Sequence, residues 1–413
     1  MDGVKRFQSH KIKRLLKSFA AVVVTGPRQA GKSTIARMVA DNWLYFDLEN
    51  PGHFDRIHDD PVLFFRENPE YIIIDEAQRS PRLFEVLRGV IDADRNKKGR
   101  FILTGSASFE LISAISETLA GRVAIVELAP LKVDEALGRP LPSFYELFEN
   151  KINPEFAAII SKLPLTKTHA ELKQGLLNGG FPEPCLKGDK EFLLDWMDNY
   201  FDTYINRDIR YLFPRLDIVR YRRVVAMLSS LSGTIINKSE ISRSIEVKEK
   251  SVRDYLEIIS GTYFWRELPA FLTPQIKTTQ KLSKGHFCDS GLGLFLQNIH
   301  SMQDLDSYPK LGNYFEAFIV EELIRGFQAV KIRNLKFHHF RTKAGGEIDL
   351  IVTGSFGTLP IEVKYASNVR AKQVLSLKNF VEIHNLDLGI VISNAESASM
   401  IADKILQLPA RCI

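Results

Sequence analysis

The sequence contains few cysteines and no long apolar run. Cys185, Cys288 and Cys412 lie far apart and form no C-x-x-C pair, so neither a disulfide framework nor a zinc site is expected. No apolar stretch approaches the roughly 20 residues needed to span a bilayer, and the basic N-terminus lacks the apolar core of a secretory signal. These absences favour a cytoplasmic protein that does not enter a membrane.

The sequence also has little excess charge of either sign. Its 413 residues carry a formal net charge of +5, and 45% of them are hydrophobic and 25% charged. This is the balance of an ordinary globular chain with room for two or three domains. The mild positive charge permits contact with nucleic acid without requiring it. No internal repeat or low-complexity tract is present.

Short apolar segments and amphipathic segments alternate through the first 130 residues. This alternation predicts an α/β domain with a parallel sheet. Strands are expected at residues 20–24, 43–47, 71–74, 101–103 and 123–128, and helices at 11–19, 32–41 and 81–91.

A phosphate-binding loop is predicted at residues 26–33, which read GPRQAGKS. A strand precedes this G-x-x-x-x-G-K-[ST] motif and a helix follows it, which is the context that the motif requires. Backbone N–H groups would face the phosphates of ATP, Lys32 would supply a point charge, and the Ser33 hydroxyl would bind Mg²⁺. The predicted nucleotide-binding residues are Gly26, Pro27, Arg28, Gln29, Ala30, Gly31, Lys32, Ser33, Thr34 and Thr104.

Two further segments fit the same chemistry. IIIDEAQ at 72–78 delivers two carboxylates at the end of a strand: Asp75 is expected to hold the magnesium shell and Glu76 to orient the attacking water. ILTGSAS at 102–108 ends another strand with hydroxyls, and either Thr104 or Ser106 would sense the γ-phosphate. A plain turn is nearly as good an explanation of that segment.

Arg122 lies in LAGRV at 119–123. It is a candidate arginine finger, acting within the chain or from a neighbouring subunit. A structural salt bridge is the equal alternative, and a homo-oligomer would follow only from action between subunits.

The order of these motifs resembles that of a family of prokaryotic AAA-like P-loop ATPases; the motifs are GPRQAGKST, IIIDEAQ, ILTGSAS and LAGRV. In that family a winged-helix region and a nuclease-like C-terminal domain of poorly defined role follow the ATPase. Four later segments resemble those parts: KGHFCDSGLGLFL (284–296), NYFEAFIVEEL (313–323), GGEIDLIV (345–352) and LPIEVKYA (359–366). The implied fold is an AAA-like parallel-sheet P-loop domain (1–135), a helical connector (136–220), a winged-helix-like region (221–300) and an α/β restriction-endonuclease-like domain (301–413).

The C-terminal part carries a second set of candidate catalytic residues. Strand alternation places Glu362 and Lys364 on one face, and a hairpin through residues 354–358 would bring Asp349 beside Glu362. Paired carboxylates suit Mg²⁺, an upstream helix adds Glu316, and the lysine would stabilise charge on a phosphate. The set Glu316, Asp349, Glu362 and Lys364 resembles the PD-(D/E)xK nucleases, which hydrolyse phosphodiesters with metal ions. Solvated strand charges, or a nuclease fold kept only for binding, are the alternatives.

Residues 221–268 suggest three helices followed by a hairpin. Ser239 is expected to cap the second helix, and the third would present Lys248, Lys250, Ser251 and Arg253 to DNA. Residues 201–260 hold 11 Lys and Arg against 8 Asp and Glu, so a protein-binding module is an equal alternative. The basic stretch at 331–343 could also contact a DNA backbone, with a solvated strand face as the equal alternative. Its His338 and His339 favour structural roles.

The leading hypothesis is an ATPase that couples hydrolysis to DNA binding and carries a metal-dependent nuclease-like domain. The alternative is a nucleotide-driven switch or scaffold whose nuclease-like domain is inactive and only binds DNA or protein.

Overall fold

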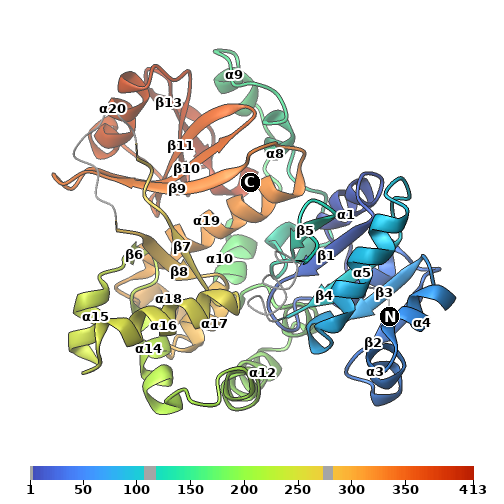
Figure 1. Cartoon of the computed structure of the whole chain (residues 1–413). Helices are drawn as coiled ribbons and strands as arrows, with labels where there is room; N and C mark the ends of the chain where they lie inside the picture. The colour runs from blue at the N-terminus through green and yellow to red at the C-terminus, as the bar shows by residue number, and fades with distance from the viewer. Residues whose placement is uncertain (1–2, 107–117, 273–281) are drawn as a thin grey trace. The chain divides into compact units, whose positions relative to one another are not determined.

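The computed structural model describes residues 3–106, 118–272 and 282–413 and is drawn in Figure 1. The chain divides into two compact units: Met1–Leu131 with Gly261–Tyr263, and Lys132–Ser260 with Phe264–Ile413. Within the described ranges, no helix combines the length and apolarity needed to cross a bilayer. The finer division into four domains stays a prediction.

The first unit is built on a five-stranded parallel sheet with the order β2-β3-β4-β1-β5. Its strands are rich in Val and Ile and largely buried, which is typical of a parallel sheet covered on both faces. All five expected strands are confirmed, with ends shifted by one or two residues. They are β1 (Ala21–Thr25), β2 (Leu44–Asp47), β3 (Ile72–Asp75), β4 (Phe101–Gly105) and β5 (Val123–Glu127).

The three helices expected in this unit are confirmed, and its described part contains two more α-helices. α1 ends before Phe19, which still packs against the sheet cluster. The additional helices α3 and α4 begin after Asn50 and Asp60. The side chain of each of these residues accepts hydrogen bonds from N–H groups of the first helical turn, and a proline follows each of them. The helices are α1 (Gln8–Leu16), α2 (Lys32–Val39), α3 (Pro51–His58), α4 (Pro61–Glu67), α5 (Arg82–Ala93) and the 3₁₀ helix η1 (Ala77–Arg79).

Helices dominate the first half of the second unit. The stretch after Leu131 forms short helices, and longer helices follow it, in agreement with the expected helical character of residues 136–220. They are α7 (Val133–Ala136), α8 (Phe144–Leu147), α9 (Phe156–Ile160), α10 (His169–Asn178), α11 (Pro182–Lys187), α12 (Lys190–Thr203), the π-helix η2 (Tyr204–Ile209), α13 (Arg210–Leu212), α14 (Ile218–Ser230), α15 (Lys238–Ser244) and α16 (Glu249–Gly261).

A small antiparallel sheet accompanies α14, α15 and α16. Its strands β6 (Thr234–Ile235), β7 (Trp265–Leu268) and β8 (Lys284–Phe287) lie in the order β6-β8-β7. One local expectation is wrong: Asn237, not Ser239, accepts the N-terminal N–H group of α15. Ser239 lies inside the helix, and its hydroxyl instead donates to Glu249.

The second half of this unit contains a six-stranded sheet with the order β13-β14-β12-β11-β10-β9. It includes β9 (Lys336–Arg341), β10 (Glu347–Gly354) and β11 (Gly357–Lys364), and β10 and β11 form the expected antiparallel hairpin. α19 and α20 pack in separate hydrophobic clusters with strands of this sheet. The remaining elements are α17 (Ser290–Phe295), α18 (Met302–Ser307), α19 (Leu311–Ala329), η3 (Ala371–Val374), α20 (Leu375–Ile383), β12 (Gly389–Ser393), β13 (Ser399–Ala402), β14 (Ile405–Pro409) and η4 (Ala410–Cys412).

Candidate functional site

The predicted phosphate-binding loop joins β1 to α2. Gly26 has φ +146°, and a Cβ atom there would lie 2.2 Å from the carbonyl oxygen of Leu128, so only glycine fits without displacing backbone. Gly31, with φ +90°, directly precedes α2. Gln29 also has a positive φ of 60°. The loop therefore takes the tight, irregular path that aims N–H groups at an anion.

Lys32 is almost fully buried, and its ammonium folds over the loop. Its Nζ donates to the carbonyl oxygens of Pro27 at 2.8 Å and Gly26 at 3.1 Å. Ser33 and Thr34 follow in the first turn of α2. Arg28 forms an ion pair with Glu49 at 3.0 Å. The motif residues thus lie together in one loop and one helical turn.

Arg6 makes hydrogen bonds to the backbone of this loop, a role that the sequence did not predict. Its guanidinium donates to the carbonyl oxygens of Ala30 at 2.7 Å and Ala129 at 2.5 Å. It thereby ties the phosphate-binding loop to the segment that follows β5. A lone arginine before the first helix gives no sequence signal for such a contact, because both acceptors are backbone atoms.

The acidic pair lies at the carboxyl end of β3. Asp75 is buried and accepts hydrogen bonds from Tyr45 Oη at 2.6 Å and from Thr104 Oγ1. Glu76 has a left-handed backbone (φ 52°, ψ 44°) and accepts from Ser106 Oγ at 2.9 Å. Such a conformation is costly for a glutamate and occurs mostly where a side chain must be aimed.

The order of the strands explains why these groups meet. β4 lies between β1 and β3, so its last residues reach the same sheet edge as the loop and the acidic pair. Thr104 donates to Asp75 and Ser106 donates to Glu76, so these two hydroxyls of ILTGSAS each orient one carboxylate. Ala107 and Ser108, which complete that motif, lie outside the described residues.

Tyr45 on β2 is a further residue of this site that the sequence did not indicate. Burial, together with the hydrogen bond to Asp75, raises the pKa of Tyr45, so the phenol stays protonated and donates. The carboxylate is therefore bound by two neutral hydroxyl groups. The carboxylate of Asp75 and the hydroxyl of Ser33 are oxygen donors of the kind that Mg²⁺ prefers.

Arg122 lies away from this edge. It comes just before β5, at the amino end of the parallel strands, and makes a two-pronged ion pair with Asp92, with both N–O distances at 2.8 Å. The hydrogen bond from Arg122 lowers the pKa of Asp92 to about 2. This geometry favours the salt-bridge interpretation over a finger acting within its own chain.

The C-terminal candidates also converge. β10 and β11 pair with Leu350 opposite Ile361, and the next residues along, Asp349 and Glu362, are both buried. Asp349 accepts from the backbone N–H of Val363 at 2.8 Å. Lys364 Nζ lies 2.5 Å from Glu362. The hairpin expected from the sequence therefore brings these three side chains to one place.

Lys284 was not foreseen, and it changes the interpretation of this cluster. Its buried ammonium lies 2.9 Å from Asp349, 2.5 Å from Glu347 and in contact with Glu316. Across the described ranges, no group of three or more His, Cys, Asp or Glu residues is arranged to hold a metal ion. The expected metal site at Glu316, Asp349 and Glu362 does not fit, because an ammonium stands among the carboxylates.

His339 takes a structural role, as favoured. The His339 ring nitrogen Nε2 lies 2.8 Å from the carbonyl oxygen of Leu282, and burial lowers the pKa of His339. Arg341 from the same basic stretch pairs with Glu347 at 3.0 Å. His339 and Arg341 of this stretch therefore make contacts inside the domain.

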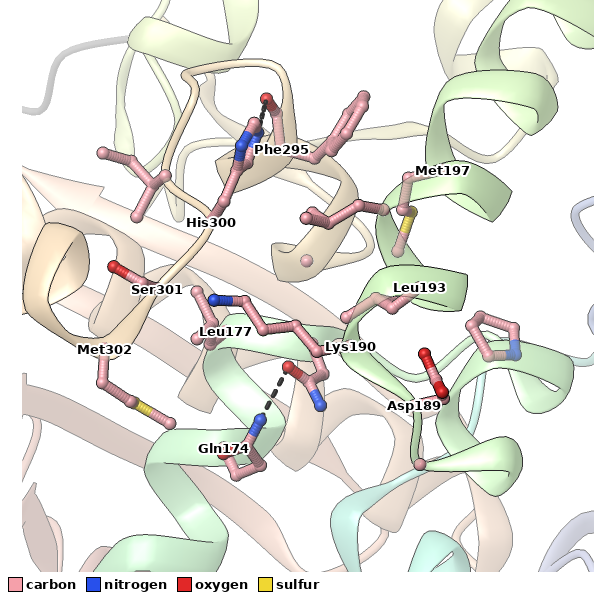
Figure 2. Close-up of a pocket in the computed structure, with 16 residues that line it drawn as sticks. Gln174, Leu177, Asp189, Lys190, Leu193, Met197, Phe295, His300, Ser301 and Met302 are labelled. Carbon is pink, nitrogen blue, oxygen red and sulfur yellow. Dashed lines mark hydrogen bonds between the residues drawn. The ribbon is translucent and has the colours of Figure 1, made fainter.

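A separate cavity of about 290 Å³ lies among α10, α12, α17 and the start of α18 (Figure 2). Leu193, Met197 and Phe295 contribute apolar surface, and Lys190 and His300 contribute polar groups. It contains none of the residues expected to act in either site.

The loop, the acidic pair and the interposed β4 define the first unit as a P-loop NTPase domain. Residues 18–137 match the AAA domain family, residues 169–303 match a domain of unknown function, DUF8612, and residues 311–413 match another, DUF4143. The chain is thus similar to AAA ATPases at one end and to a domain without assigned activity at the other.

Similar whole chains carry no assigned activity in their names. Uncharacterized proteins of Mycobacterium tuberculosis and Mycobacterium bovis are each 29% identical over 408 residues, covering 98% of this chain and 83% of theirs. Among solved structures, the Walker-type ATPase of Pyrococcus abyssi shares 16% identity, with a TM-score of 0.45 over 70% of this chain and 94% of its own. The RuvB Holliday junction branch migration motor of Thermotoga maritima shares 18%, with a TM-score of 0.31 over 64% and 90%.

Proposed function

We propose that this chain is a magnesium-dependent ATPase whose nucleotide state controls a partner-binding second unit. One observation carries the proposal: the phosphate-binding loop, the Asp75–Glu76 pair and the hydroxyls of β4 meet at one edge of one parallel sheet. That edge is where open α/β sheets bind their ligands. The AAA domain match over residues 18–137 agrees with this placement.

The proposed mechanism assigns each group a task. Loop N–H groups and Lys32 bind the phosphates, and Ser33 and Asp75 hold magnesium, which when bound offsets negative charge on the phosphate oxygens. Glu76 orients water and accepts its proton. The water oxygen bonds to the γ-phosphorus while the bond to the β–γ bridging oxygen breaks, and ADP leaves with that electron pair.

Magnesium-dependent phosphate release from ATP tests this proposal. Lys32→Ala removes the charge on the β- and γ-phosphates, and turnover should fall on the order of 10²–10³-fold, as when other transition-state donors are lost. Lys97→Ala is the matched control, because Lys97 is exposed and makes only a long surface ion pair at 3.9 Å with Glu70. Unchanged turnover in Lys32→Ala would remove the basis of the proposal.

DNA is the proposed partner of the second unit. The support is the resemblance of residues 221–268 to a winged helix-turn-helix, together with the three helices and small sheet found there. Lys248 and Lys250 are exposed at the start of α16, whereas the exposed Arg253 pairs with Glu249. A homo-oligomer stays a prediction.

Salt dependence of binding separates DNA from protein partners. Duplex DNA binding by wild type should weaken steeply with salt, and a Lys248→Ala, Lys250→Ala double variant should have a shallower slope by about two phosphate contacts. Lys151→Ala with Lys162→Ala removes two exposed lysines elsewhere in the unit and should leave the slope unchanged. Identical slopes in all three proteins would exclude α16 as the DNA contact.

Binding, rather than cleavage, is the proposed task of the C-terminal domain. Metal-dependent hydrolysis at Asp349 and Glu362 was expected from the sequence, but the donor set holds the Lys284 ammonium. The geometry therefore favours the alternative in which the nuclease-like domain only binds.

A further inference from the structure

Four carboxylates of the C-terminal domain surround two ammonium groups. Glu316 comes from α19, Glu347 and Asp349 from β10, and Glu362 from β11. Lys364 forms an ion pair with Glu362, while Lys284 contacts the other three. The place where several carboxylates converge is thus filled by Lys284, whose strand belongs to a different sheet.

Lys284 is fixed in this place by its strand. β8 is the middle strand of its sheet, and Lys284 pairs with Ile235 on one side and Leu268 on the other. Next to it, Gly285 packs so closely on the Trp265 ring that a Cβ atom would lie 2.2 Å away. The lysine side chain is 4% exposed. The ammonium is therefore an internal part of the fold, not a surface charge resting on an acidic patch.

Lys284 and the carboxylates around it shift one another's pKa values. Burial opposes its charged form, but Asp349, Glu316 and Glu347 outweigh this and raise the pKa of Lys284 well above its usual value. Burial and Asp349 raise the pKa of Glu316 well above its usual value and that of Glu362 to about 8. Although burial opposes ionisation of Asp349, Lys284 and Lys364 lower its pKa, so its ionised form faces two ammonium groups.

We propose that Lys284 is the built-in cation of the C-terminal carboxylate cluster and closes it to divalent metal ions. The cluster then joins β8 to α19 and β10 through charge, and the domain lacks the metal-activated water that phosphodiester cleavage needs. This inference rests on the proposed function only where it treats the domain as a binding module. It is independent of ATP hydrolysis, so the two can fail separately.

Removal of the lysine charge tests the proposal directly. Free Mn²⁺ is titrated by electron paramagnetic resonance into nucleotide-free full-length protein. Lys284→Met keeps the length of the side chain but leaves the carboxylates without their cation, and it should bind Mn²⁺ at least about tenfold more tightly than wild type. Adding Asp349→Asn to that variant should abolish the gain. Lys336→Met, which removes an exposed lysine of β9, should gain nothing.

Thermal unfolding covers the case in which the variant folds poorly. Lys284→Met should melt below wild type and recover on addition of Mn²⁺, whereas Lys284→Arg and wild type should be insensitive to Mn²⁺. If Lys284→Met cannot fold alone, refolding with Mn²⁺ should restore it. Wild-type Mn²⁺ binding that Asp349→Asn removes would overturn the proposal, and so would a Lys284→Met protein that neither gains Mn²⁺ affinity nor responds to it.

Discussion

The two candidate sites each contain a buried lysine, and the lysines differ in what surrounds them. Lys32 donates to two neutral carbonyl oxygens of its own loop, while hydroxyl groups bind the nearby Asp75. Lys284 stands among three carboxylates. The first arrangement keeps a cation available for phosphates and a carboxylate available for a metal ion. In the second, the cation and the carboxylates neutralise one another.

The largest expected effect is a contrast between two Lys→Met variants. Lys284→Met breaks a buried ion cluster and should lower the free energy of unfolding by about 3–5 kcal/mol. Lys32→Met removes the hydrogen bonds to two neutral loop carbonyl oxygens, which should cost about 1–3 kcal/mol, but it should lower ATP turnover on the order of 10²–10³-fold. Urea unfolding followed by tryptophan fluorescence measures both, because Trp43 lies in the first unit and Trp196 and Trp265 lie in the second.

Equal losses in the free energy of unfolding for Lys32→Met and Lys284→Met would contradict the proposed difference between the two lysines. So would loss of ATP turnover in a Lys284→Met protein whose first unit still unfolds like that of wild type.

A pair of Gly→Ala variants sharpens the account of the nucleotide site. Gly26 and Gly121 both have positive φ, but an added Cβ at Gly121 meets nothing within 4 Å. Gly121→Ala should therefore cost only backbone strain, roughly 1–2 kcal/mol. Gly26→Ala adds a clash with Leu128 and should cost about 1–3 kcal/mol more, with loss of ATP binding. Calorimetric titration with ATP and thermal unfolding would check this, and equal effects at both positions would contradict it.

A smaller effect should appear in the pH dependence of the second unit. Because the pKa of Glu362 is raised to about 8, the folded state holds a proton that the unfolded chain releases near pH 4.5. The stability it provides is present below pH 4.5 and is lost as pH rises to about 8, with a slope of at most about 1.4 kcal/mol per pH unit for one group. Glu362→Gln should flatten that fall in urea unfolding at pH 5, 6.5 and 8. An unchanged slope would show that Glu362 does not carry the proton.

The nucleotide site was largely predictable because its parts are local and its sheet is parallel. The loop is one continuous motif, and the carboxyl ends of neighbouring strands meet at one edge, so Asp75, Glu76 and Thr104 follow from strand order. Tyr45 was missed, since only the pairing of β2 with β3 brings its hydroxyl to Asp75.

The C-terminal site was predictable only within its hairpin. Alternation and a short turn sufficed to join Asp349 with Glu362 and Lys364. Lys284 lies 65 residues before Asp349 and on a different sheet, so no spacing rule relates them. The segment KGHFCDSG did contain a signal for a buried ion pair. Its lysine, Lys284, begins a buried strand, and neither residue next to it in the sequence is acidic. The strands β12 to β14 were missed as well, although GIVIS at 389–393 is an apolar run of strand length.

The central claim is that Glu76 activates water at the edge of the first sheet. Single-turnover ATP hydrolysis by Glu76→Gln, beside ATP binding by the same protein, tests it most directly. The amide keeps the shape and the hydrogen bond with Ser106 but cannot accept the proton, so hydrolysis should fall on the order of 10²–10⁴-fold while binding persists. Hydrolysis at the wild-type rate would contradict the claim.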